Sequence, residues 1–196
     1  MIITQLTIQD IPAVVTLHQR CLPTTTSSLF GKDYLLHLYQ TIYQHAARHL
    51  LYVAKEKEAV IGVITVSLDL KKTQSVMRQA LFPKEIPTIL RGMLRGTIPI
   101  GKFFSQMKIK NTLIAQYPDP YTEILTLFVD ATYRRKGIAH KLISHAQSEL
   151  IKRHIHNLYV DTEVMNKSAQ SFYVSAGFIK QAVIEDAMIF SKPLKK

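Results

Sequence analysis

The segment from residue 123 to about residue 153 constrains the fold of this 196-residue chain more than any other. A strand-like run, EILTLFV at 123–129, leads into the basic turn TYRRKG at 132–137, and a helical stretch then continues to about Arg153. Such a turn exposes backbone N–H groups at the positive end of the helix dipole, and Gly137 lets an anion come close to them. The segment therefore predicts a strand, turn and helix that fit a pyrophosphate.

Strands and helices alternate along the rest of the chain. We expect strands at 2–8, 50–55, 60–68 and 158–160 and a closing hairpin at 178–183 and 187–190. We expect helices at 12–21, 33–48 and 168–176, with a polar loop, TTTSS, at 24–28. No repeat, low-complexity tract or linker interrupts this order, so residues 1–196 are predicted to form a single mixed α/β domain.

The composition indicates a soluble cytoplasmic protein. No apolar run reaches the ~18 residues of a membrane span, and the longest, 60–68, is strand-sized and contains a glycine. The first ten residues have no basic residue ahead of the apolar ones, so no signal peptide is expected. The single cysteine, Cys21, excludes an internal disulfide and is interpreted as a buried thiol, and no metal site is expected.

Positive charge is concentrated in one segment. Residues 71–110 hold nine Lys or Arg and one acid, Glu85, which gives +8 of the chain's net +11. Pro87 is predicted to begin a basic amphipathic helix there, with Arg91 and Arg95 off its apolar face. That apolar face consists of Ile86, Ile89, Leu90, Met93 and Leu94. We expect a basic helical insertion at about 71–116, whose charge suggests an anionic partner.

Two spaced motifs resemble a known family. Arg134-x-x-Gly137-x-Ala139 after a strand is similar to the [Q/R]-x-x-G-x-[G/A] signature of the GNAT superfamily of N-acetyltransferases. Downstream, Asn166, Tyr173 and the run AGF at 176–178 resemble the family's N-x-x-A-x-x-x-Y-x-x-x-G-F block, with Ala169 also in place. The resemblance is close over 121–180 and loose before that.

The resemblance implies a largely antiparallel central sheet flanked by helices, with the insertion before strand four. Strands four and five splay apart, and the pantetheine arm of acetyl-CoA lies between them. The backbone of Leu127 and Val129 would pair with that arm, and Asn166 would hydrogen-bond it. The turn that begins at Arg134 would hold the pyrophosphate through the N–H groups of Arg135, Lys136, Gly137, Ile138 and Ala139.

The resemblance also implies two catalytic side chains. Tyr173 would protonate the departing thiolate, because a phenol with a pKa near ~10 is a suitable acid for that step. Glu123 would take the proton from the attacking amine, and Asp161 and Glu163 are weaker candidates for that role. Each residue also has a purely structural interpretation. Tyr173 would then be a core aromatic, and Glu123 would be a solvent-facing glutamate at the start of a strand.

The expected activity is transfer of an acetyl group from acetyl-CoA to a primary amine by direct attack in a ternary complex. The acceptor stays open among small molecules, amino sugars and peptide amines, and the basic helix with Arg91 and Arg95 is predicted to form one wall of its site. The alternative is a non-catalytic GNAT-like module that docks on an anionic membrane or nucleic acid through the insertion. No nucleic acid is expected, because the insertion lacks a stacking platform beyond Phe103-Phe104. Peripheral membrane contact stays open, as do the monomer and the homodimer.

Overall fold

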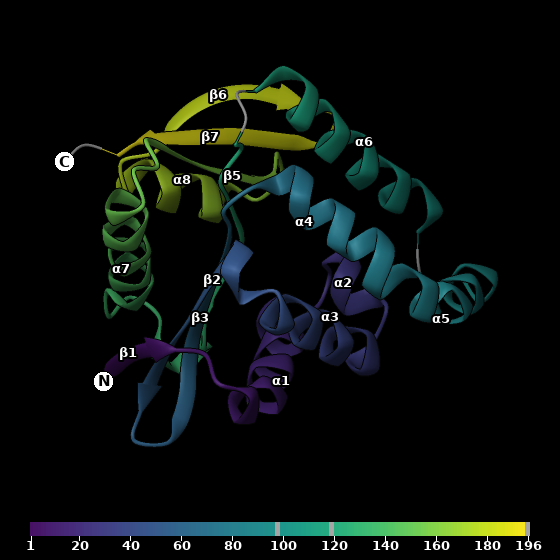
Figure 1. Cartoon of the computed structure of the whole chain (residues 1–196), viewed down its shortest axis with the longest axis horizontal. Helices are drawn as coiled ribbons and strands as arrows, with labels where there is room; N and C mark the ends of the chain where they lie inside the picture. The colour runs from purple at the N-terminus through teal and green to yellow at the C-terminus, as the bar shows by residue number, and fades with distance from the viewer. Residues whose placement is uncertain (97–98, 118–119, 195–196) are drawn as a thin grey trace.

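The computed structural model describes residues 1–96, 99–117 and 120–194, and it contains a seven-stranded sheet in the order β1-β2-β3-β4-β5-β7-β6 (Figure 1). The strands are β1 (Ile2–Gln5), β2 (His49–Glu56), β3 (Ala59–Ser67), β4 (Glu123–Val129), β5 (Asn157–Glu163), β6 (Ile179–Ile184) and β7 (Ala187–Pro193). The pair β4–β5 is parallel, and all other neighbours are antiparallel. The expectation of a largely antiparallel sheet is confirmed.

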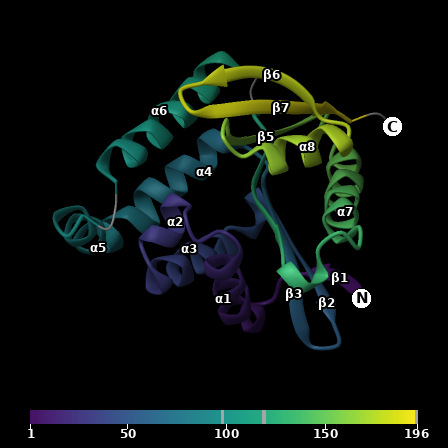
Figure 2. The same cartoon turned by 180° about the vertical axis from the view of Figure 1, so that it is seen from behind.

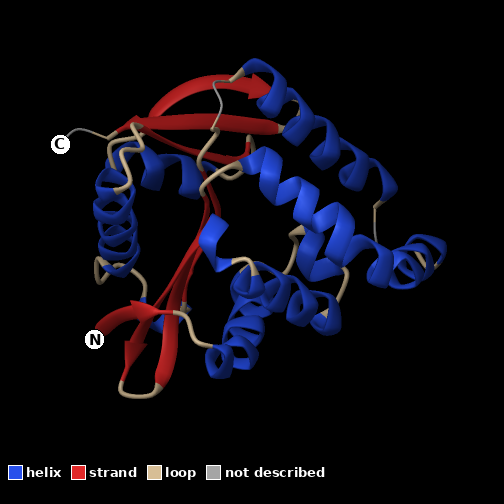
Figure 3. Ribbon diagram, viewed as in Figure 1, coloured by secondary structure: helices blue, strands red, loops and turns tan. Residues whose placement is uncertain are grey.

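Helices cover both faces of this sheet (Figure 3). They are α1 (Ile11–Cys21), α2 (Thr26–Leu29), α3 (Lys32–Gln44), α4 (Leu70–Val76), α5 (Phe82–Leu94), α6 (Ile100–Gln116), α7 (Ile138–Lys152) and α8 (Lys167–Ser175). Helices α7 and α8 pack on one face through Leu142 and Tyr173, while α1 and α3 pack on the other through Val14 and Leu35. Because β3 is covered on both faces, its side chains are buried from residue 61 to residue 67, which explains the continuous apolar run seen in the sequence.

Strands β4 and β5 are joined at one point. Glu123 of β4 is in register with Tyr159 of β5, and the Tyr159 amide donates to the carbonyl of Thr122 at 2.9 Å. No further register pair joins the two strands, although both are described along their whole length. The sheet therefore opens between strands four and five, as predicted, and Figure 1 shows its two halves at a wide angle.

The described part of the insertion between β3 and β4 is mostly helical, and residues 97–98 and 118–119 lie outside the described chain. Helix α4 continues through the π-helical turn η3 (Met77–Leu81) into α5, and α6 then returns to the end of the β6–β7 hairpin (Figure 2). Ile109 and Leu113 of α6 share a core there with Tyr159 of β5 and Ile189 of β7. The prediction that Pro87 begins a helix is wrong, because Pro83 occupies the first turn of α5 and Pro87 lies inside it. The helical hydrogen bonding carried through η3 lets α5 begin five residues earlier than Pro87 suggests.

Two local expectations near the N-terminus also need correction. Strand β1 ends at Gln5 because the Thr7 amide donates to Asp10 at 3.0 Å, in a capping box that starts a 3-10 turn at Ile8. The expected loop at 24–28 is wrong in its second half, where the single-turn helix α2 begins at Thr26. Among the described residues, no helix is both long and apolar enough to cross a bilayer.

Candidate active site

The turn after β4 presents free backbone amides. Gly137, the N-cap of α7, has a φ of +74°, and Arg135 has a φ of +60°. The first α7 amide with a partner inside the helix belongs to Lys141, which donates to the Gly137 carbonyl at 3.0 Å. The amides of Ile138 and Ala139 therefore have no carbonyl acceptor in the helix. Nothing lies within 4 Å of the position that a Cβ on Gly137 would occupy, so the approach to these amides is open.

The basic side chains of the turn are partly engaged within the protein. The Nε of Arg134 donates to the Val129 carbonyl at 3.2 Å, and the Cys21 thiol donates to the same oxygen at 3.5 Å. The Lys136 ammonium lies 4.9 Å from the centroid of the Tyr133 ring. The Val129 carbonyl, expected to face the pantetheine arm, is therefore already an acceptor for two protein groups.

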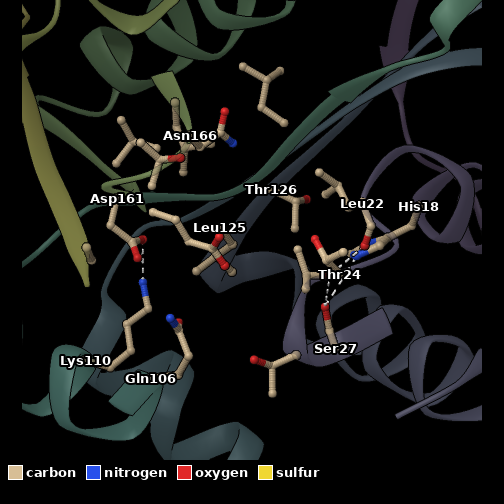
Figure 4. Close-up of a pocket in the computed structure, with 18 of the residues that line it drawn as sticks. His18, Leu22, Thr24, Ser27, Gln106, Lys110, Leu125, Thr126, Asp161 and Asn166 are labelled. Carbon is tan, nitrogen blue, oxygen red and sulfur yellow. Dashed lines mark hydrogen bonds and ion pairs between the residues drawn. The ribbon is translucent and has the colours of Figure 1, made fainter. Parts of the chain in front are cut away.

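A pocket of about 640 Å³ lies at the opening between β4 and β5 (Figure 4). One wall comes from the two strands and α8, with Leu127, Asp161, Asn166 and Tyr173. The facing walls come from the N-terminal helices and from the insertion, and they include His18, Cys21, Thr24, Ser27, Arg78, Phe82, Gln106, Lys110 and Asn111. The pocket thus joins the predicted pantetheine wedge to a space closed by the insertion.

Lys110 of α6 links the two strands where they fork. Its ammonium donates to Oε1 of Glu123 and to Oδ1 of Asp161, both at 2.8 Å, and Figure 4 shows it pointing at Asp161. The Glu123 side chain is 0% exposed, whereas Asp161 and Lys110 are 16% and 21% exposed. Oε2 of Glu123 is buried without a hydrogen-bond partner. The alternative interpretation, a solvent-facing Glu123 at a strand start, is therefore wrong, because Lys110 and α6 cover this side chain.

Burial and the neighbouring charges set the pKa values of Glu123, Asp161 and Lys110. Burial raises the pKa of Glu123 to about 8, because the lowering effect of Lys110 is opposed by the nearby Asp161. Burial would also raise the pKa of Asp161, but the Lys110 charge and hydrogen bonds hold that pKa below its ordinary value. Burial alone would lower the pKa of Lys110, but the charges of Asp161 and Glu123 raise it instead. At neutral pH the cluster therefore holds an ionic Lys110–Asp161 pair beside a Glu123 that is mostly protonated.

Tyr173 and Asn166 lie in the same pocket. Burial raises the pKa of Tyr173, and the charges of Asp161 and Glu123 raise it further, which keeps the phenol protonated. Tyr173 is 7% exposed and packs on Phe178 and Phe190 as a core aromatic, and it also lines the pocket. Oδ1 of Asn166 accepts from the Ala169 amide at 3.0 Å, which makes Asn166 the N-cap of α8.

Two pocket residues, Lys110 and His18, were not predicted from the sequence. Lys110 was one of nine basic residues in the insertion, and nothing in its spacing marked it as the one that turns inward. His18 is 1% exposed, its Nδ1 lies 2.8 Å from the Tyr39 hydroxyl, and burial lowers its pKa to about 4. The burial of His18 could have been predicted, because it lies among the apolar residues of the first helix and a side chain at such a position faces the core.

Other predicted residues play smaller parts. Arg91 and Arg95 are exposed and do not line the pocket, whose basic residues from the insertion are Arg78 and Lys110. Cys21 is partly exposed rather than buried, and burial raises its thiol pKa, so no thiolate is favoured. Across 1–96, 99–117 and 120–194, no three His, Cys, Asp or Glu side chains come together as a metal site.

Comparison with curated proteins finds N-alpha-acetyltransferases. The chain is 39% identical over 84 residues to N-alpha-acetyltransferase 30 of Saccharomyces cerevisiae, and this alignment covers 42% of this chain and 44% of that protein. It is 25% identical over 131 residues to N-alpha-acetyltransferase 30 of Xenopus laevis, and this alignment covers 66% of this chain and 46% of that protein. The chain thus spans less than half the length of these relatives.

Solved structures show the same fold at low identity. The ribosomal-protein-S18-alanine N-acetyltransferase of Escherichia coli matches with a TM-score of 0.57 and 16% identity, covering 100% of this chain and 94% of that one. The paia N-acetyltransferase of Thermoplasma acidophilum, in complex with coenzyme A, matches with a TM-score of 0.62 and 16% identity, covering 98% of each chain.

A family model covers most of the chain. The model of the acetyltransferase (GNAT) family matches residues 11–178, which include the insertion, the turn after β4 and the Asn166 to Phe178 block. The order of the sheet and its opening between β4 and β5 agree with that match. The chain belongs to the acetyltransferase (GNAT) family.

Proposed function

We propose that this protein is an acetyl-CoA-dependent N-acetyltransferase that transfers the acetyl group directly to a primary amine. The observation that carries the proposal is at the fork of β4 and β5, where two pocket-lining residues, Tyr173 and Asp161, lie near Glu123, which Lys110 links to Asp161. The amide-rich turn lies at the other end of β4. Family membership supports the same reaction. The lone Cys21 supports a cytoplasmic location, where thiols stay reduced.

The residues present fit acetyl-CoA. The free amides of the first α7 turn and the open space at Gly137 suit a pyrophosphate, because a helix N-terminus attracts anions. Leu127 and Asn166 line the opening of the sheet, where a pantetheine arm would lie parallel to β4. When bound, acetyl-CoA supplies the acetyl thioester. In this proposal Arg134 orders the turn by holding the Val129 carbonyl, and the amides of the turn bind the phosphates.

Tyr173 and Glu123 handle the two protons of the reaction. The amine forms a bond to the acetyl carbon, the carbon–sulfur bond breaks, and the thiolate that leaves needs a proton, which Tyr173 donates. The amine loses a proton, and Glu123 accepts it. A general base is most effective when its pKa is close to the ambient pH, and the pKa of Glu123 is about 8. Lys110 is a positioning residue in this scheme, since it holds Glu123 and Asp161 together and makes ionisation of Glu123 less costly.

The proposed acceptor is a primary amine, with the α-amine of a peptide as the first class to test. The names of the curated relatives support that order, as does the E. coli neighbour, which acts on the alanine of a ribosomal protein. The facing walls of the pocket carry polar groups from Thr24, Ser27, Gln106 and Asn111 that could bind a peptide backbone. Cys21 offers no activated nucleophile, which supports direct transfer.

An acceptor panel with thiol detection tests the proposal. Purified protein is incubated with acetyl-CoA and peptides of varied first residue, amino sugars or small amines, and released coenzyme A is followed together with the acceptor's mass. Acetyl-CoA-dependent gain of one acetyl group on an amine is expected for at least one class. Tyr173→Phe is the matched control, because it keeps the buried ring and removes the hydroxyl. Acetylation that is unchanged in this variant would contradict the assigned acid.

A further inference from the structure

One helix of the insertion exposes an apolar face. Ile86, Leu90 and Leu94 of α5 are 51%, 54% and 89% exposed, and Pro83 and Pro87 beside them are exposed as well. Their spacing of three and four residues places all five on one side of the helix. We call this side the α5 outer face. A single exposed apolar residue is ordinary, but a continuous row along a helix indicates a surface that is covered in function.

A basic row runs along the edge of the α5 outer face. Lys84, Arg91 and Arg95 are spaced seven and four residues apart, so they share one side of the helix, next to the apolar row. Within the described residues, none of the three forms an ion pair. The helix's one acid, Glu85, is 2% exposed and contacts His37 of α3. The outward charge of α5 is therefore wholly positive.

The opposite side of α5 fixes the helix to the protein. Glu85 and Ile89 are buried, and Ile89 belongs to a small core with Phe30, Tyr34 and Leu81. Figure 1 shows α5 at the edge of the molecule farthest from α7, with no other described helix or strand beyond it. The α5 outer face is thus held on a packed support and directed outward.

We propose that the α5 outer face docks the protein on an anionic lipid surface. An amphipathic helix binds there by burying its apolar row among the acyl chains while Lys and Arg contact the anionic headgroups. The charge argues for this partner, because nine of the 25 Lys and Arg lie in residues 71–110 with only one acid. This inference goes beyond the proposed acetyl transfer and does not depend on it, since binding is measured without acetyl-CoA.

Two other partners fit the face less well. Nucleic acid would be bound by charge alone, and the apolar row would be left exposed or would press against phosphates. A second copy of the chain would cover the apolar row but would bring two basic rows together, which repel each other. An anionic lipid surface would bury the apolar row and pair the basic row with headgroups in the same binding event.

Vesicle sedimentation tests the proposal with two double variants. The parent protein is expected to bind phosphatidylcholine vesicles with about 30% phosphatidylserine at low salt, and to be released at about 0.5 M salt. Arg91→Ala with Arg95→Ala should weaken binding about 30-fold, at about 5-fold for each charge. Leu90→Ser with Leu94→Ser should weaken it about 100-fold. Arg153→Ala with Lys180→Ala removes two exposed charges elsewhere and should leave binding unchanged.

An introduced tryptophan reports insertion of the helix directly. The chain has no Trp, so Leu90→Trp gives an emission from α5 alone. Anionic vesicles should shift that emission to shorter wavelength and protect it from quenching by acrylamide. Val183→Trp on β6, where the parent residue is 55% exposed, is the matched control and should not respond.

Several results would overturn the proposal. Failure of the parent to bind anionic vesicles at low salt is one, and equal loss of binding in the control pair is another. If the parent does not bind vesicles but binds RNA, and the arginine variant no longer binds RNA, the α5 outer face would be assigned to nucleic acid. A parent dimer that the leucine variant converts to a monomer, again without vesicle binding, would assign it to self-association. Unchanged melting temperatures of the variants confirm that each one is folded.

Discussion

Replacement of Lys110 by Met perturbs the proposed base through a single charge. The Lys110 ammonium lies 2.8 Å from Oε1 of Glu123 and lowers the Glu123 pKa, so its removal must raise that pKa above about 8. Two unit charges at ~4 Å interact by about 4 kcal/mol at an effective dielectric constant of ~20, which corresponds to about 3 pKa units. Because Lys110 is partly exposed, we expect a rise of about 1 to 3 units.

The expected result is a displaced pH–rate profile. The rate depends on ionised Glu123, so it rises with pH through the Glu123 pKa, and at pH ~8 the variant should be about 5- to 500-fold slower than the parent. At higher pH the two rates should approach each other. The assay is the initial rate of coenzyme A release with a saturating acceptor between pH 6 and 10.

A neighbouring lysine supplies the control for this prediction. Lys108 also lies on α6, but it is exposed and pairs with Glu185 on the surface, so Lys108→Met should leave the profile in place. Loss of Lys110 also leaves Asp161 without its cation, which should cost about 3–5 kcal/mol of stability, so rates are measured well below the variant's melting temperature. A slower variant with an unshifted pH–rate profile would show that Lys110 does not tune the pKa of the base and acts through structure alone.

Three further predictions address the cofactor, the acid and a buried histidine. Saturating acetyl-CoA, at 100 times its Kd, should raise the melting temperature by roughly 5 to 10 °C, which corresponds to ~2.7 kcal/mol. Gly137→Glu should abolish the rise, whereas Gly96→Glu, at a glycine with a similar φ of +69° and equal space, should keep it. Tyr173→Phe should lower turnover by ~10²-fold while the Kd for acetyl-CoA, measured by calorimetry, stays the same. The pKa of His18 is lowered to about 4, so unfolded His18 takes up its proton first, and stability is lost as pH falls from ~6.5 to ~4. The stability advantage of the parent over His18→Gln, measured by urea unfolding, should shrink by up to about 3 kcal/mol across that range, and a constant advantage would contradict the burial argument.

The elements that the sequence predicted well are those in which local signals and packing agree. The apolar run at 123–129 formed β4, and the glycine of the following turn formed the positive-φ cap of α7. The spacing of Asn166 and Tyr173 matched a short helix with Asn166 as its cap. In each case a side chain or glycine acts on its own backbone neighbourhood, which is why the pattern could be read locally.

The remaining features depend on contacts between distant segments. Lys110 meets Glu123 and Asp161 only after α6 has folded back over the fork of the sheet, and no spacing along the chain encodes that meeting. The burial of Glu123 follows from the same contact. Pro87 carries a helix-start signal, but the turns before it were already helical, so the local signal was overridden.

A structure with bound coenzyme A or acetyl-CoA would test the proposed cofactor site. We expect the pyrophosphate to lie against the amides of residues 135–139 and the sulfur to lie between β4 and β5, within hydrogen-bond reach of the Tyr173 hydroxyl. Oδ1 of Asp161 should remain paired with Lys110, so that the fork of the sheet keeps its shape. A cofactor bound away from the turn would contradict the proposed phosphate site, and a sulfur that Tyr173 cannot reach would contradict its role as the acid.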